Sequence, residues 1–372
     1  MKEKNTVPVW GGNYSPYRLV SLDGDVWSVS LEDVNTKLYD NTKLFRLSFN
    51  IDVGISPLSL IILFDGTLVL PQCSDIPKTK ALAIFNKHLT DLLLGGLFVQ
   101  EVAPDDVTPG SLNFWGYHRH HCPKGRYAKL SQSLRIRKAD LDDAILLYNP
   151  QIITKSDYLL HHSIGYKLRK QLPEGFSAVF LPSCTAFSCE KWERALILGW
   201  TSIELIIEEM WRQRVVSKSY VSGITKRRRK EFLSDSRTWS SSTKIELLWQ
   251  IGSIPDEIYS LVDKARVARN SFIHSAKTCT PEDARSAIEG TLSLIETINQ
   301  DCDVLFNRNN LMRILDESTS HFRSPIADEN GRLIVQPTLW RYPDPAPGFE
   351  DWGDRPFEKR LDIQLVPLKK DN

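Results

Sequence analysis

One segment of the chain is apolar around most of its circumference when it is read as a helix. The segment SCEKWERALILGWTSIELIIEEMWRQRV begins at Ser188, and its large apolar side chains recur at helical spacing: Trp192, Leu196, Ile203, Ile206, Ile207, Met210 and Trp211. So broad an apolar surface must be covered by other helices or by a second copy of the chain. The pattern therefore predicts a helix that is central to a bundle or to an oligomer interface.

The helical pattern continues from this segment to about residue 300. Another helix follows in SSTKIELLWQIG, and a long one begins near Pro255 and ends in the motif RNSFIH. The last helix has Thr280 as N-cap, Pro281 at its first position and Asp283 in its first turn, where the helix dipole favours an acid. We expect residues 176–302 to form an antiparallel bundle of about four helices joined by short loops.

The flanking regions have different patterns. Residues 1–175 are predicted to form a strand-rich α+β domain. YRLVSLDGDVWSVS and SLIILFDGTLVLPQ each place Asp-Gly between strand-like runs, the strongest short hairpin signal. Further strands are expected in GLFVQEV and LNFWGYHRH, and helices over 79–94 and in KSDYLLHHSIGYKLRKQL. Residues 303–372 are rich in Pro, Gly, acidic and aromatic residues, and we expect an extended arm. The fold class is therefore α+β.

Composition bounds the class of protein. A chain of 372 residues favours two domains, and 41% hydrophobic with 25% charged residues is typical of a soluble globular protein. The net charge of +1 provides no global attraction for nucleic acid, so any RNA binding would need a local patch. Six cysteines without a C-x-x-C pair, no signal peptide and no apolar run long enough for a membrane lead us to expect a cytoplasmic protein.

The motif helix has an arginine where an apolar residue would be expected. At about 100° per residue, Arg269 falls on the same face as Val262, Ala265 and Phe272. Because burying an unpaired guanidinium costs several kcal/mol, this side chain needs an acidic partner, a phosphate or a wet interface. Glu204 is the corresponding oddity in the apolar helix upstream. We expect these two residues to pair, and the plain alternative is a structural salt bridge between helices.

The rest of the motif adds groups suited to RNA cleavage. Asn270 and His274 share a neighbouring face, but His274 is about 140° around the helix from Arg269. These groups could flank one phosphate if the helix ends or bends after Ser271, or if a second subunit completes the site. The ribose 2′-OH would attack its own phosphate, the histidine would move protons and the arginine would balance charge.

The segment ARVARNSFIH resembles the R-x(4–6)-H signature of the HEPN (higher eukaryotes and prokaryotes nucleotide-binding) superfamily, often written R-N-x-x-x-H. ILGWTSIELII is similar to the family's first helix, in which Glu204 occupies the acidic position, and TPEDARSAIEGTLSLIETI resembles its closing helix. The likeness covers about residues 188–300 and is nearest to the Apea-like branch linked to phage defence. It implies a homodimer with a composite cleft and metal-independent endoribonuclease activity that uses Arg269, Asn270, His274 and Glu204.

This resemblance also frames the alternatives. Ala276 stands where members regulated by nucleotidyl transfer carry Tyr, so that mode of regulation is not supported. The expected role is a toxin or phage-defence effector that needs no cofactor, with an unknown trigger ligand or protein acting on the N-terminal domain. The alternative is a non-catalytic HEPN module that binds RNA or dimerises.

Two other clusters have both a functional and a plain interpretation. Arg227, Arg228, Arg229 and Lys230 lie in a loop between bundle helices, where they would bind RNA phosphates or form a solvated charged loop. His118 and His120 would face the same way on a strand, beside His121 and Cys122, as a metal site requires. The second ligand pair would have to come from His161 and His162, so we expect a polar strand end rather than a metal site.

Overall fold

The computed structural model describes residues 6–55, 58–217, 231–233, 235–299 and 306–319. The chain divides into two units, Met1–Thr319 and Ser320–Asn372, and all the described residues belong to the first. Within the first unit the fold is mixed α+β with an antiparallel sheet and many helices, as the sequence predicted. Of the extended arm expected over 303–372, residues Arg308–Thr319 form a helix (α13) instead, and residues 320–372 lie outside the described part.

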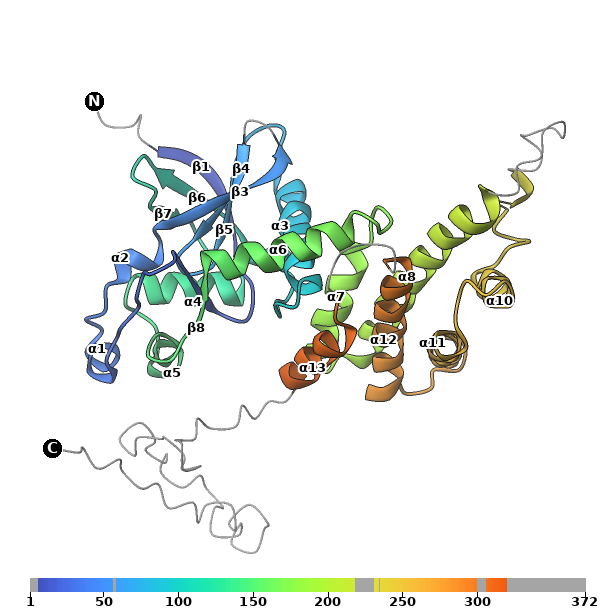
Figure 1. Cartoon of the computed structure of the whole chain (residues 1–372). Helices are drawn as coiled ribbons and strands as arrows, with labels where there is room; N and C mark the ends of the chain where they lie inside the picture. The colour runs from blue at the N-terminus through green and yellow to red at the C-terminus, as the bar shows by residue number, and fades with distance from the viewer. Residues whose placement is uncertain (1–5, 56–57, 218–230, 234, 300–305, 320–372) are drawn as a thin grey trace, which may run out of the picture. The chain divides into compact units, whose positions relative to one another are not determined.

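An antiparallel sheet forms the N-terminal part of the molecule (Figure 1). Among the described residues, six strands pair in the order β3, β4, β5, β1, β6, β7. Their bounds are Leu47–Ile55 (β3), Leu58–Leu63 (β4), Leu68–Pro71 (β5), Thr6–Gly12 (β1), Val107–Asn113 (β6) and His118–His120 (β7). Each neighbouring pair is antiparallel. The predicted strands of LNFWGYHRH thus correspond to the end of β6 and to β7.

The two Asp-Gly hairpin predictions had different outcomes. The turn at Asp65-Gly66 joins β4 to β5 as predicted, and Gly66 has a φ of +79°, which favours glycine. The predicted hairpin at Asp23-Gly24 is wrong. The strand before it, β2 (Arg18–Ser21), pairs in parallel with β8 (Gln151–Thr154), a partner distant in sequence. The segment GLFVQEV is also not a strand. Val99 and Val102 are buried, but the segment does not pair with a strand of either sheet.

Two helices of the N-terminal part pack closely against each other. Helix α3 (Lys78–Leu94) matches the helix predicted over 79–94, and α6 (Lys155–Arg169) matches the second predicted helix. Gly165 allows the close approach, since a Cβ there would lie 1.7 Å from the carbonyl oxygen of Asp91. The remaining elements of this part are α1 (Leu31–Thr36), α2 (Asn41–Leu44), α4 (Arg126–Arg135), α5 (Leu141–Ala144) and the 3₁₀ turns η1 (Pro104–Asp106) and η2 (Ile145–Leu147).

The second half of the unit is helical, and the apolar helix is central to it. This helix, α8 (Trp192–Trp211), packs against four others: α7 (Ser177–Ser188), α10 (Ser241–Gln250), α11 (Asp256–Ser275) and α12 (Pro281–Ile298). A π-helical turn, η3 (Arg212–Val216), follows α8. The capping box of Thr280 and Asp283 begins α12 as predicted. The expectation of a central helix is therefore confirmed.

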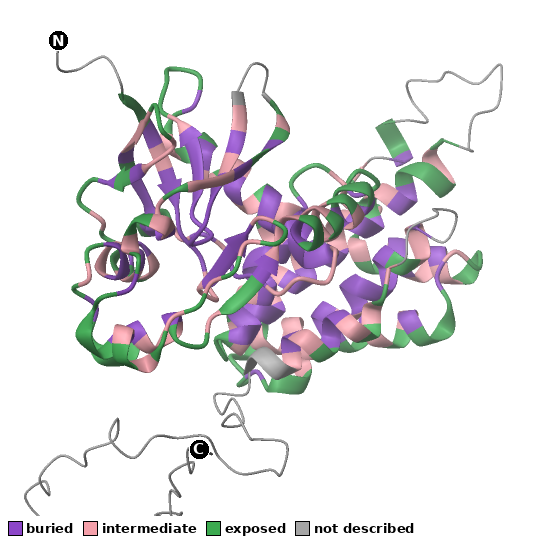
Figure 2. Ribbon diagram, turned by 60° about the vertical axis from the view of Figure 1, so that its left-hand side comes forward, coloured by how far each residue is buried: buried purple, intermediate pink, exposed green. Residues whose placement is uncertain are grey.

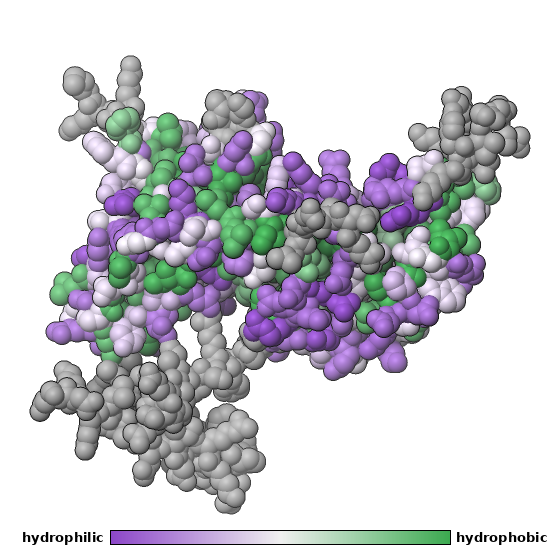
Figure 3. Space-filling view, viewed as in Figure 1, coloured by the Kyte–Doolittle hydropathy of each residue, from purple (hydrophilic) through white to green (hydrophobic). Residues whose placement is uncertain are grey.

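Helix α13 covers part of this bundle. It packs against α7 and α12, and Arg285 of α12 forms ion pairs with Asp316 of α13 and with Glu289. Hydrophilic side chains gather over α12 and α13 on the face seen in Figure 3. Polar contacts at the surface and buried apolar residues beneath, such as Leu311 and Leu315, hold the helix in place.

A continuous cluster of buried residues links the strand-rich part to the bundle. It extends among the described residues from Tyr14 through Phe180 and Ile203 to Leu315 (Figure 2). The domain boundary predicted near residue 175 falls between α6 and α7, so this boundary does not separate two independent cores. Across the described part of the chain, none of the helices has the combination of length and apolar character needed to span a bilayer.

Candidate functional site

The RNSFIH motif occupies the last two turns of α11. The helix continues without a break to Ser275, and Ala276 ends it in the left-handed conformation, with a φ of 49°. The suggestion that the helix ends or bends after Ser271 is therefore wrong. Arg269 and His274 project from one regular helix in directions about 140° apart. A single copy of this helix cannot place both side chains side by side.

Arg269 lies where the buried face of α11 approaches the surface. Val262 and Ala265, earlier on this face, are fully buried, whereas Arg269 and Phe272 are half-buried. An Nη of Arg269 donates a hydrogen bond of 3.0 Å to Oδ1 of Asn270. Within the described residues, Arg269 forms no ion pair with a carboxylate. Its positive charge is thus oriented by an amide and left without a counter-ion from the described part of the chain.

Glu204 does not provide the expected counter-ion. Its carboxylate accepts a hydrogen bond of 3.1 Å from the Ser241 hydroxyl at the start of α10. One turn further along α8, Glu208 pairs with Lys244, also on α10. The acidic edge of α8 thus makes its contacts with α10, although α8 also packs against α11. The predicted Arg269–Glu204 pair is not formed because α10 supplies polar partners to this edge.

His274 is exposed on the final turn of α11. A positive imidazolium at this position would interact favourably with the negative end of the helix dipole. Apolar side chains are exposed near it, with Val267 49% and Ile273 47% accessible. The end of α11 therefore combines an accessible proton-transfer group with apolar surface that is not covered by the described residues.

A cavity of about 270 Å³ lies beside the motif, between α11 and the beginning of α12. Two of its lining residues are cations, Lys264 and Lys277, and Asp283 is also at its wall. Of the motif residues, Ser271 lines this cavity, whereas Arg269, Asn270 and His274 do not. The cavity supplies positive charge next to the motif but is not itself the predicted catalytic cleft. Arg227, Arg228, Arg229 and Lys230, the predicted RNA-binding cluster, lie outside the described residues.

His118 and His120, on strand β7, belong to a buried polar network. The guanidinium of Arg135 donates a hydrogen bond of 2.9 Å to Nδ1 of His118 and bonds Asp65 through Nε and an Nη, each at 2.8 Å. His120 shares a hydrogen bond of 2.8 Å with the hydroxyl of Thr108. These contacts use both imidazoles to connect β6, β7 and α4 inside the fold. The polar strand end expected here is buried, and its histidines have hydrogen-bond partners that the sequence did not predict.

Burial and charge fix the protonation states in this network. Burial, followed by the nearby charge of Arg135, lowers the pKa of His118 to about 3, and the same two effects lower the pKa of His120 well below its usual value. Burial alone would raise the pKa of Asp65, but the charge and hydrogen bonds of Arg135 lower it overall. Both histidines are therefore neutral and Asp65 is ionised at neutral pH.

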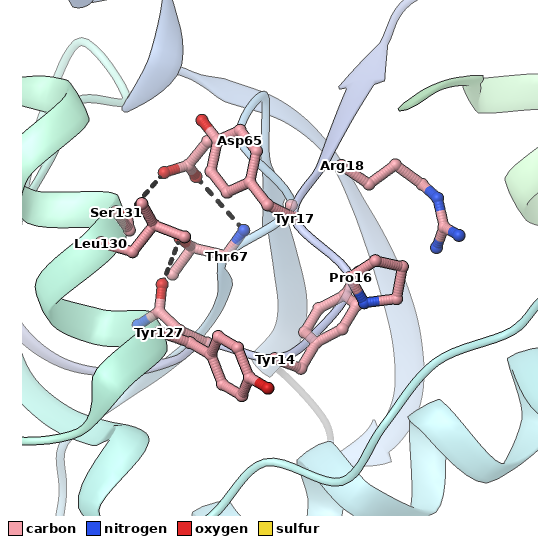
Figure 4. Close-up of a pocket in the computed structure, with 11 residues that line it drawn as sticks. Tyr14, Pro16, Tyr17, Arg18, Asp65, Thr67, Tyr127, Leu130 and Ser131 are labelled. Atoms are coloured by element: carbon pink, nitrogen blue, oxygen red, sulfur yellow. Dashed lines mark hydrogen bonds between the residues drawn. The ribbon is translucent and has the colours of Figure 1, made fainter. Parts of the chain in front are cut away.

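The neighbouring hollow has little room for a ligand (Figure 4). It is lined by Tyr14, Tyr17 and Tyr127, with Asp65 hydrogen-bonded to Ser131 at 2.7 Å. Its volume of about 10 Å³ is roughly that of a single water position. In the part of the chain that the structure describes, there is also no group of three or more His, Cys, Asp or Glu side chains arranged for a metal ion. This network is best understood as a structural one.

Sequence reasoning missed a larger hollow, a cavity of about 580 Å³ between α3, α6 and the end of β3. His162, considered in the sequence only as a remote metal ligand, lines it together with His88 and Asp91. Polar residues at helical spacing on α3 and on α6 were visible in the sequence, but only the packing of the two helices brings these two rows together.

Comparisons of the chain with family models, with curated proteins and with solved structures found no significant match.

Proposed function

We propose that the chain is a metal-independent endoribonuclease of the HEPN type, acting as a homodimer in which the ends of two α11 helices form one cleft. Arg269 stabilises the phosphate, Asn270 orients it and His274 transfers protons. The observation that carries this proposal is the lack of a carboxylate partner for Arg269 among the described residues. Its guanidinium is half-buried, oriented by Asn270 at 3.0 Å and without an ion pair among the described residues. A phosphate would supply the missing negative charge.

The chemistry requires only groups of the protein and of the RNA. One imidazole removes the proton from a ribose 2′-OH, and the 2′-oxygen attacks the adjacent phosphorus. The bond to the 5′-oxygen of the next nucleotide breaks, and a second proton donor protonates that oxygen. The products are a 2′,3′-cyclic phosphate and a 5′-hydroxyl. Arg269 would offset the additional negative charge that develops on the phosphorus oxygens in the transition state.

A dimer explains how one histidine for each chain would supply both an acid and a base. Since Arg269 and His274 of one helix project about 140° apart, a phosphate held between two helices could contact both kinds of side chain. The exposed Val267 and Ile273 provide apolar surface close to the motif. Glu204 is not assigned to Arg269 in this arrangement, because its carboxylate bonds Ser241.

The decisive experiment incubates the purified full chain with RNA in excess EDTA. We expect cleavage to persist without metal and to fall by about 10²–10⁴-fold in His274→Ala, the usual contribution of a general acid or base. His121→Ala is the matched control, because His121 is also exposed but lies on the loop after β7. Unchanged cleavage by His274→Ala would reject the site, and loss of wild-type cleavage in EDTA would reject the metal-independent mechanism.

Mixing the two proteins tests the composite cleft. If each site needs two motif histidines, adding excess His274→Ala chain to wild type should suppress cleavage as mixed dimers form. Wild-type cleavage that is insensitive to the variant, or a monomer by light scattering at the assay concentration, would contradict the shared site. RNA binding by a stable dimer that lacks cleavage would instead favour the alternative, a non-catalytic RNA-binding or dimerisation module.

The cellular role that fits this activity is a toxin or phage-defence effector, restrained or triggered through the N-terminal part by an unknown ligand or protein. Induced expression of the wild type should then arrest growth, whereas His274→Ala at equal abundance should not. Equal toxicity of the two proteins would show that growth arrest does not depend on the proposed nuclease activity.

A further inference from the structure

The cavity between α3 and α6 is built from one face of each helix. On α3, Lys80, Lys87 and Asp91 recur at helical spacing, and on α6 His162 and Arg169 do the same. The volume of about 580 Å³ lies within the range of roughly 300–1,000 Å³ that is common for small-molecule sites. The cavity is therefore large enough for a ligand, unlike the hollow beside Asp65.

Positive charge exceeds negative charge around this cavity. Asp91 is already occupied, because Arg169 pairs with both of its carboxylate oxygens. Lys80, Lys87 and Lys170 also line the cavity, are exposed and form no ion pair with any described residue. Asp52, near the end of β3, is the second carboxylate among the described residues of the wall. The arrangement leaves a surplus of lysine charge directed at one space.

A buried histidine in the wall has an unused ring nitrogen. Nε2 of His88 hydrogen-bonds the Tyr158 hydroxyl at 2.7 Å, whereas Nδ1 has no hydrogen-bond partner among the described residues. Burial, followed by the charges of His162 and Arg169, lowers the pKa of His88 well below its usual value, so the ring is neutral. Leaving a buried polar atom unpaired destabilises the fold, and a ligand or a water in the cavity would remove this penalty.

We propose that this cavity is a binding site for a phosphate-bearing small molecule of nucleotide size. The phosphate oxygens would accept hydrogen bonds from Lys87 and Lys170, which act as compact point charges for phosphate. Tyr166 lies at the same wall with a half-exposed ring, and Lys170 is 4.6 Å from its centroid. The proposal does not depend on the nuclease function, since none of these residues belongs to α11.

Calorimetric titration of the full chain tests the site with three probes: inorganic pyrophosphate, ATP and adenosine. Saturable binding of pyrophosphate or ATP, with none of adenosine, is the expected result. ATP binding tighter than pyrophosphate would identify the nucleoside as part of the ligand, and equal binding would identify the phosphate alone. Absence of saturable binding of both phosphates at millimolar concentration would overturn the proposal.

A pair of charge-reversed variants locates the binding. Lys87→Glu combined with Lys170→Glu should weaken pyrophosphate binding by about tenfold or more. Lys129→Glu combined with Lys167→Glu makes the same change in net charge at exposed positions that do not line the cavity, and should leave affinity within about threefold. Equal weakening by both pairs would show nonspecific attraction and overturn the assignment. So would competition by an RNA oligonucleotide that binds more tightly through the same two lysines.

Discussion

Two arginines of this chain lie near histidines in sequence or in space, and their surroundings differ sharply. Arg135 is almost fully buried, and its three nitrogens bond Asp65, Thr67 and His118. Arg269 is half-buried at the end of α11 and bonds only the Asn270 amide among the described residues. The first guanidinium is satisfied by the fold itself, and the second is oriented but has no counter-ion.

The difference follows from the energetics of charge burial. A fully buried guanidinium would destabilise the chain by several kcal/mol without a carboxylate and full hydrogen bonding. A half-buried one remains in contact with water, so the fold can tolerate it without an acidic partner. Arg135 therefore has the surroundings of a structural residue, whereas Arg269 has those of a residue available to a ligand.

The largest effect is expected from Arg135→Met. This variant leaves Asp65 buried without a counter-charge and should reduce the free energy of unfolding by about 3–5 kcal/mol, measured by denaturant titration. Adding Asp65→Asn should recover part of the loss, because the uncompensated charge is removed. A loss below about 1 kcal/mol would mean that the network is not a structural one.

The same substitution at the other arginine sharpens the comparison. Arg269→Met should change the free energy of unfolding by less than about 1 kcal/mol, since no ion pair with a described residue is lost. RNA cleavage should fall by about 10²–10³-fold, the usual effect of removing a donor that stabilises transition-state charge. If Arg269→Met strongly destabilised the protein while its folded fraction still cleaved RNA at the wild-type rate, Arg269 would be a structural residue rather than a catalytic one.

Acidification should destabilise the N-terminal network through His118. The pKa of this histidine is about 3 in the folded chain and near 6.5 in the unfolded chain, because burial disfavours its charged form. The unfolded chain therefore binds the proton first, and stability present above pH 6.5 is lost as the pH falls toward 3. His118→Asn retains an acceptor for Arg135 but cannot titrate, so unfolding free energies measured across this window should show a shallower slope. An unchanged slope would contradict the buried neutral imidazole.

The smallest effect is expected from Glu204→Gln. Because the Gln oxygen can still accept the hydrogen bond from Ser241, stability should change by less than about 0.5 kcal/mol. Cleavage of RNA should stay within about threefold of wild type, measured as an initial rate. A loss of tenfold or more would show that Glu204 supports Arg269 in the active dimer, as the sequence had suggested.

Several helices were predicted well because their signal is local, although α4 and α7 were not predicted. The bounds of α3 and α6, the central position of α8 and the cap of α12 all follow from apolar spacing and from residues within a few positions. The turn at Asp65-Gly66 was equally local. Predictions about pairing over long distances failed, and so did the extended arm where α13 forms a helix.

The strand after Pro16 illustrates the reason. β2 carries the same Asp-Gly signal as β4, yet its partner is β8, and residues such as Arg18 and Gln151 are 133 positions apart. Glu204 is a second example. Its carboxylate on an apolar helix was recognised as needing a partner, but the partner on α10, Ser241, was not predicted. A local pattern states that a side chain needs a partner, but it does not state which distant element will provide one.

The sequence by itself determined the α+β class, the helices α3, α6, α8, α11 and α12, and the presence of Arg269, Asn270 and His274 at the end of α11. Only the tertiary structure decided that His118 is buried against Arg135, that Glu204 faces α10, and that the polar rows of α3 and α6 enclose a single cavity. Periodicity is set by residues within a few positions of one another. Burial and partner choice depend on which distant elements pack together, and these decide whether a charged side chain is structural or available to a ligand.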